Sequence, residues 1–241
     1  MWPVMKQFWL ILAAVLGLAA TSVPASADLL FTLNQGGGAF STPGNYGTVR
    51  LHQNGTGATA YVTVTVQLAS GATFAGTDAG YAIAWDIRSS SGCSGNACYP
   101  GPTLSSVTVT SANSANFTPT QTNASGDQNI KATPFTGGKC TQSGANCFEY
   151  GIDYKIGGSK GTDNKLIFDV KKTGGLVLTD FIANQNGYRF AVDIAFNHKT
   201  GNVAAKGDGV RVPEPQTWLL FIAGLAVLPL LQRRRRLARA T

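Results

Sequence analysis

The sequence has little charge, little histidine and few runs of helix-forming residues. Charged residues make up 13% of the 241 residues, and there are two histidines. Glu149 is the only glutamate before Glu214, while Thr, Ser, Gly and Asn are abundant. Long helices need Leu, Glu, Lys and Ala, so this composition argues against a helical fold and favours an all-β one.

Positive charge is also scarce in the body of the chain, although the whole sequence has a net charge of +7 and a pI near 9.4. Lys6 lies near the N-terminus, and five arginines and Glu214 lie in the last thirty residues. The residues from Asp28 to Val212 hold thirteen bases and eleven acids, a net charge of +2. Nucleic-acid binding requires a basic surface on the folded domain, so we expect no nucleic-acid partner.

Catalytic motifs are absent as well. No Gly-x-Ser-x-Gly elbow precedes a helix, and there is no His-Glu-x-x-His pair. Residues 157–161, Gly-Gly-Ser-Lys-Gly, lie between expected strands and are interpreted as a hairpin turn. The two histidines, His52 and His198, fall beside turns, where a solvated surface position is expected. Asp86, Asp153 and Asp193 fall at out-facing strand positions, and nothing marks two of them as a glycosidase pair. We therefore predict a protein that is not an enzyme and has no cofactor or metal.

Residues 1–27 have the organisation of a secretory signal peptide. Lys6 provides the positive start, residues 8–20 are uncharged and mostly apolar, and Ala25 and Ala27 form a small-x-small cleavage site. The mature chain is then expected to begin at Asp28, outside the inner membrane.

Residues 211–241 form a second targeting region. Val212, Pro213, Glu214 and Pro215 come first, and the two prolines favour an extended segment outside regular structure. An apolar run follows that begins at Trp218 and ends at Leu231. A basic tail closes the chain, and a cytoplasmic location is predicted for its four consecutive arginines, Arg233, Arg234, Arg235 and Arg236.

This arrangement resembles the PEP-CTERM sorting signal of Gram-negative bacteria. The resemblance lies in the Pro213-Glu214-Pro215 triplet, Trp218, Gly224-Leu225 and the arginine cluster. It implies recognition by exosortase, a membrane protease-transpeptidase, and a cut near the triplet. The alternative is an ordinary membrane anchor behind a proline-rich linker.

The apolar run is short for a permanent transmembrane anchor. Fourteen helical residues span about 21 Å, whereas the hydrocarbon core of a bilayer is about 30 Å thick. This mismatch favours a transient membrane segment that is removed by processing. The expected final location is the periplasm, the cell surface or the medium.

Between the two targeting regions, residues 28–210 are expected to form one β-domain. Several segments alternate apolar and polar residues with a period of two, and the Asn54-Gly55 turn joins two of them into a hairpin. Residues 178–187 are the one stretch with a helical pattern, with Thr179 as the cap and Gly187 at the end. The expected strands are 29–33, 48–52, 58–68, 81–87, 104–110, 148–156, 166–171 and 188–196.

Many short strands separated by turns predict a β-sandwich or jelly-roll-like domain with one short helix. Parts of this body also look like a recurrent body of PEP-CTERM proteins. These parts are Asn45-Tyr46-Gly47-Thr48-Val49, residues 74–85, Phe190-Ala191-Val192-Asp193-Ile194 and Thr200-Gly201-Asn202-Val203. That resemblance implies a single β-rich exported domain and no particular activity.

The four cysteines are Cys93, Cys98, Cys140 and Cys147. An even number of cysteines in an exported protein predicts disulfides. Three pairings are open, of which the two local ones, Cys93–Cys98 with Cys140–Cys147, are favoured. A zinc site is disfavoured, because the spacings differ from those of zinc knuckles and no histidine is near. Calcium binding through loop oxygens at Asp163-Asn164, Asp127-Gln128-Asn129 or Asp208 is a weaker hypothesis.

The function expected from the sequence is a structural or adhesive role in an exopolysaccharide or biofilm matrix. Hydroxyl and amide side chains, with exposed aromatics such as Tyr46 or Tyr99, would contact sugars. The alternative is a carbohydrate-binding module or lectin-like domain, and a glycan-active enzyme is a third possibility. The expected partners are exosortase, the inner membrane before processing, and exopolysaccharide.

Overall fold

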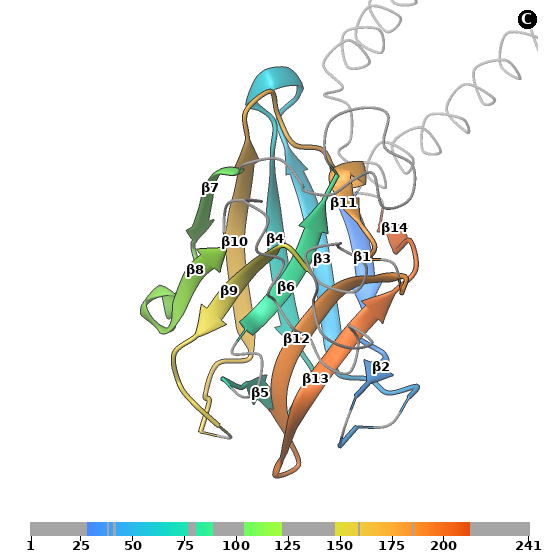
Figure 1. Cartoon of the computed structure of the whole chain (residues 1–241), viewed down its shortest axis with the longest axis vertical. Helices are drawn as coiled ribbons and strands as arrows, with labels where there is room; N and C mark the ends of the chain where they lie inside the picture. Colours follow the sequence, from blue (N-terminus) through green and yellow to red (C-terminus); the bar gives the residue numbers. More distant parts are fainter. Residues whose placement is uncertain are drawn as a thin grey trace, which may run out of the picture. The chain divides into compact units, whose positions relative to one another are not determined.

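The computed structural model describes residues 28–37, 39–40, 42–76, 81–88, 104–121, 148–158, 160–184 and 186–212. They belong to one compact unit, Asp28–Val212 (Figure 1). The strands are β1 (Asp28–Thr32), β2 (Gln35–Gly36), β3 (Gly47–Asn54), β4 (Tyr61–Leu68), β5 (Ala72–Phe74), β6 (Tyr81–Ile87), β7 (Leu104–Val109), β8 (Phe117–Gln121), β9 (Tyr150–Tyr154), β10 (Lys165–Lys172), β11 (Phe181–Ile182), β12 (Tyr188–Phe196), β13 (Lys199–Lys206) and β14 (Val210–Val212).

These strands form two antiparallel sheets. The six-stranded sheet has the order β14-β1-β3-β4-β10-β7. The eight-stranded sheet has the order β2-β13-β12-β6-β9-β8, with β11 beside β6 and β5 beside β12. In Figure 1 the strands of the eight-stranded sheet overlie those of the six-stranded sheet. The predicted all-β, sandwich-like architecture is confirmed.

The core lies between the sheets and follows from the period-two alternation. In β4, Val62, Val64 and Val66 are fully buried, whereas Thr63 and Thr65 are half-buried. Val64 and Val66 align with apolar residues of both neighbouring strands, such as Leu51 of β3 and Phe168 of β10 opposite Val64. Burying each such side chain contributes about 1.5–3 kcal/mol, so this alternation sets the strand register.

The eight-stranded sheet differs because its central strands are buried on both faces. Phe190, Val192 and Ile194 of β12 face the core, and Ala191 and Asp193 between them are also buried. A second cluster lies away from the core on this sheet. Its buried members are Ala84, Phe148, Ala191 and Ala204, and Tyr81 and Tyr188 pack against them.

Most of the expected strands are present, and the predicted hairpin of β3 and β4 is confirmed. Two β-bulges change which face some side chains occupy. The register shifts between Tyr188 and Phe190 and between Tyr81 and Ile83. Both tyrosines therefore pack on the second cluster instead of the core, which the alternation alone did not predict.

The predicted helix at residues 178–187 is wrong. A three-residue 3-10 helix, Leu178–Asp180, is followed directly by strand β11. Asp180 accepts a hydrogen bond from the backbone N–H of Val177, and the next two residues pair with β6. Pairing of Phe181 with Ile87 buries the phenylalanine, and this tertiary contact outweighs the weak helical pattern.

The last strand includes two residues that we had assigned to the C-terminal targeting region. Arg211 and Val212 belong to β14, where they pair with Leu29 and Asp28 of β1. The compact unit thus ends at Val212, directly before Pro213.

Candidate functional site

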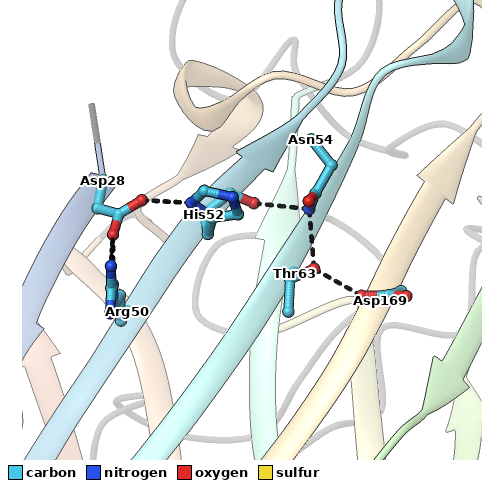
Figure 2. Close-up of polar contacts among 6 residues, drawn as sticks. All are labelled: Asp28, Arg50, His52, Asn54, Thr63 and Asp169. Atoms are coloured by element: carbon cyan, nitrogen blue, oxygen red, sulfur yellow. Dashed lines mark hydrogen bonds and ion pairs between the residues drawn. The ribbon is translucent and has the colours of Figure 1, made fainter. Parts of the chain in front are cut away.

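A row of polar residues crosses the outer face of the six-stranded sheet. His52 of β3 lies opposite Thr63 of β4, Thr63 lies opposite Asp169 of β10, and Asp169 lies opposite Thr108 of β7. Asp28 of β1 joins the row through its contact with His52 (Figure 2). The same alternation that buries the valines places these residues on the opposite face.

Asp28 is the anchor at one end of this row. Its carboxylate is 1% exposed and accepts hydrogen bonds from the guanidinium of Arg50. The Nδ1 atom of His52 lies 2.7 Å from the other carboxylate oxygen. A carboxylate accepts hydrogen bonds, so Nδ1 is the protonated ring nitrogen. We expected His52 to be a solvated surface residue. Its partly exposed ring is instead held against Asp28.

The other half of the row is a chain of hydrogen bonds. Asn54 donates to the hydroxyl of Thr63 at 2.8 Å, and this hydroxyl donates to Asp169 at 2.7 Å (Figure 2). Lys171 places its ammonium 5.0 Å from the ring centre of Tyr61 on the same face. These partly exposed hydroxyl, amide and charged groups form a hydrogen-bonding surface on the outer face of the six-stranded sheet.

The acidic residues predicted to face outward on the eight-stranded sheet are more buried than expected. Asp86 and Asp193 point away from the core, yet they are 0% and 1% exposed, and Glu149 is 2% exposed. Asp86 accepts a hydrogen bond of 2.8 Å from the backbone N–H of Glu149. Burial, and then the carboxylates of Glu149 and Asp86, raise the pKa of Tyr150. Asp153 is half-buried, and burial raises its pKa.

Asp163 is the centre of a polar cluster at the start of β10. Asn116 and the hydroxyl of Tyr154 each donate to its Oδ2 atom at 2.8 Å, and Asn113 donates to Oδ1. Burial by itself would raise the pKa of Asp163, but hydrogen bonds from Asn116, Asn113 and Tyr154 outweigh it and lower the pKa below its ordinary value.

This arrangement counts against the calcium hypothesis at Asp163, because both carboxylate oxygens accept hydrogen bonds from protein donors. Asp208 instead pairs with Arg189. Within the described ranges, no group of three or more His, Cys, Asp or Glu side chains is placed to hold a metal ion. The hypothesis for residues 127–129 falls outside those ranges.

Two pockets of similar volume lie on the described surface. The Asp163 pocket has a volume of about 280 Å³ and is lined by Ser111, Ala112, Asn113, Thr162, Asp163, Asn164, Lys165 and Ile167. The His198 pocket has a volume of about 290 Å³ and is lined by Gly71, Thr73, Ala195, Phe196, Asn197 and His198.

The His198 pocket forms because β5 pairs with the end of β12. Thr73 lies opposite Ala195, and Ala72 lies opposite Phe196. From the sequence, His198 was expected in a solvated turn, and no strand was expected at the position of β5. The lining segments are more than a hundred residues apart in the chain, so no local pattern indicated that they meet.

Several predicted residues cannot be placed. Ala25, Ala27, Tyr99, the four cysteines and every residue from Pro213 onward lie outside the described residues. Val212 is placed, as the last residue of β14. Tyr46 is a correction: it is 5% exposed and packs in the core beside Phe196, so it cannot stack on a sugar at the surface.

Among the described residues, no helix is long and apolar enough to span a membrane. Comparison with protein-family models, with curated proteins and with solved structures found no match.

Proposed function

We propose that this protein is exported, sorted by exosortase through residues 211–241, and displayed at the cell surface or released into the extracellular matrix. There it takes a structural or adhesive role among exopolysaccharide chains. Residues 1–27 act as the signal peptide, and the apolar run holds the precursor in the inner membrane until it is cut.

The observation that supports this proposal best is the pairing of the two ends of the compact unit. Asp28, the expected first residue of the mature chain, lies opposite Val212, the residue before Pro213. A cut before Asp28 and a cut after Val212 would both leave every strand of the unit Asp28–Val212 in place. The sheets therefore tolerate removal of both targeting regions.

The outer face of the six-stranded sheet supports the adhesive role. Arg50, Thr63 and Asp169 present charged and hydroxyl groups on a surface that stays accessible to solvent. A face of this kind makes many weak hydrogen bonds to hydroxyl-rich polymers. Weak contacts of this kind become effective when many copies act together along one polymer.

The intact mass of the protein, recovered from the surface and medium of its own host, tests the proposal. The expected chain begins at Asp28 and ends near Pro213-Glu214-Pro215. In a host without exosortase, and in a Glu214→Ala variant, the C-terminal tail should remain. Gln216→Ala, a neighbouring change outside the triplet, serves as the matched control and should be processed normally. Recovery of a chain that retains Arg233–Arg236 from the normal host would refute the sorting role.

A further inference from the structure

The His198 pocket lies at one end of the sandwich. In Figure 1, β5 and the turn between β12 and β13 lie at the lower end, and β14 lies in the upper part. The turn residues Asn197 and His198 contribute to the lining together with Thr73 of β5. Phe196 is partly exposed at the pocket and also packs on the buried ring of Tyr46, which fixes its position.

The backbone of this turn is unusual. Asn197 and His198 have φ values of 50° and 60°, and they are the only described residues other than glycine with positive φ. Two-residue hairpin turns of this kind prefer Asn-Gly, because glycine has no side chain to clash. A histidine at the second position carries a conformational cost, which suggests that its side chain has a use there.

The polar side chains of the His198 pocket are available for a ligand. In the described part of the chain, the side chains of Thr73, Asn197 and His198 form no hydrogen bond or ion pair. Asn197 and His198 are exposed, and Thr73 is half-buried. Together a hydroxyl, an amide and an imidazole offer both donors and acceptors within one concave site.

The lining also limits the chemistry of the ligand. Among the described residues that line the pocket, none is Asp, Glu, Lys or Arg. A neutral ligand with several hydroxyl groups matches these groups, and the partly exposed side chain of Phe196 offers an apolar contact for C–H groups. The volume of about 290 Å³ suits one sugar ring better than a larger ligand.

We propose that the His198 pocket binds a single neutral sugar residue, with His198, Asn197 and Thr73 as its hydrogen-bonding groups. The turn between β12 and β13 and strand β14 lie toward different ends of the compact unit in Figure 1. The sugar-binding role of the pocket would deepen the proposed function, on which its adhesive significance rests. Binding itself does not depend on export or sorting, so the two proposals fail independently.

Proton NMR of the intact, untagged protein tests the pocket directly, because the chain has two histidines. The protein is kept in a detergent without a sugar headgroup and titrated with methyl glycosides of glucose, galactose, mannose and N-acetylglucosamine. At least one of them should shift the imidazole resonances of His198 in a saturable manner. The resonances of His52, held at Asp28 on the other sheet, should not move.

A ligand of this size should bind with a dissociation constant on the order of 1 mM. Variants then identify the groups that bind. Binding followed through the sugar resonances should weaken at least tenfold in His198→Gly, which keeps the turn geometry, and severalfold in Thr73→Ala. Thr162→Ala makes the same change in the Asp163 pocket and should bind like the original protein.

Either of two results would overturn the proposal: none of the four glycosides shifts His198, or the affinity is unchanged in both His198→Gly and Thr73→Ala. Thermal unfolding of each variant shows whether the fold is kept. His198→Gly removes a strained side chain and is expected to remain folded. Loss of binding in that variant therefore reports on the site and not on unfolding.

Discussion

The Asp163 pocket and the His198 pocket have similar volumes, but they differ in whether their polar side chains are hydrogen-bonded to other protein groups. In the first, Asp163 accepts hydrogen bonds from three side chains, and Ser111 bonds the backbone of Ile167. In the second, the side chains of Thr73, Asn197 and His198 have no described partner. A surface pocket is thus a candidate binding site because its polar side chains are not hydrogen-bonded to the protein, and not because of its volume.

The two pockets also differ in burial. Asp163 is 5% exposed, so its hydrogen bonds are shielded from water and contribute to folding. The groups of the His198 pocket are exposed or half-buried and can exchange water for a ligand. We therefore expect substitutions in the first pocket to change stability and substitutions in the second to change binding.

Asp163→Ala should have the largest effect on stability. It leaves the hydroxyl of Tyr154 and the amides of Asn113 and Asn116 without their acceptor. Loss of buried hydrogen bonds of this kind is expected to lower the free energy of unfolding by about 3 kcal/mol. Denaturant unfolding of the two proteins measures the difference.

Asp208→Ala is the control for this substitution. Asp208 is paired with Arg189, but its side chain is 93% exposed. Its removal should change stability by no more than about 0.5 kcal/mol. Equal losses from the two substitutions would show that the Asp163 cluster has no special structural role.

The pH dependence of stability gives the second prediction. The pKa of Asp163 is lowered in the folded protein, so its stabilising effect is complete above the ordinary value of 3.8 and is lost as the pH falls through the folded pKa. The stability advantage over Asp163→Asn should therefore be largest near pH 7 and shrink in acid. Asp153, whose pKa is raised, is present in both proteins, so its effect cancels in the difference.

Unfolding curves of both proteins between pH 7 and about pH 3 test this expectation. A difference that stayed constant over the whole range would mean that the ionised form of Asp163 is not preferred by the cluster.

How far the fold could be predicted depends on whether a signal was local. The alternation Val62, Val64, Val66 was sufficient to predict β4 and its buried face. The bulges beside Tyr81 and Tyr188 were not predictable, because they depend on how neighbouring strands are aligned. The helix expected at residues 178–187 failed for a similar reason, since pairing of Phe181 with β6 is a tertiary effect.

The two pockets could not be predicted from the sequence, because their lining residues are far apart in the chain and meet only in the folded structure. Asn113 and Asp163 are 50 residues apart, and the loop position of Asp163 indicated a cation site instead of a hydrogen-bonded cluster. His198 was placed in a turn, but its approach to Thr73 depends on pairing of β5 with β12. The buried state of Asp86 and Asp193 was also missed, because alternation shows which face a residue occupies and not whether that face is covered.

Thr63→Val tests a residue that is intermediate between the two pockets. Thr63 is hydrogen-bonded to Asn54 and Asp169, like the Asp163 cluster, but it is half-exposed on the outer face of the sheet. Water can replace the lost bonds and valine favours strands, so a loss of only about 0.5–1 kcal/mol is expected.

Thr65→Val is the matched control for Thr63→Val, because Thr65 lies on the same strand and face and its hydroxyl has no hydrogen bond in the described part of the chain. It should be neutral or slightly stabilising. Should the two variants be equally stable in thermal unfolding, the hydrogen-bonded row would contribute nothing measurable.

Among the test substitutions, the controls aside, His198→Gly should have the smallest effect on stability, and in the opposite direction. Glycine adopts the φ of 60° without strain, although its freedom in the unfolded chain offsets part of the gain. We expect the free energy of unfolding to rise by about 0.5 kcal/mol.

Lys199→Gly, at the next position and within β13, should instead lower stability by a similar amount. If both glycine variants were destabilised alike, histidine would carry no strain in the turn. The stabilisation expected for His198→Gly, together with weaker sugar binding, would mean that the turn gives up stability to hold an imidazole at the pocket.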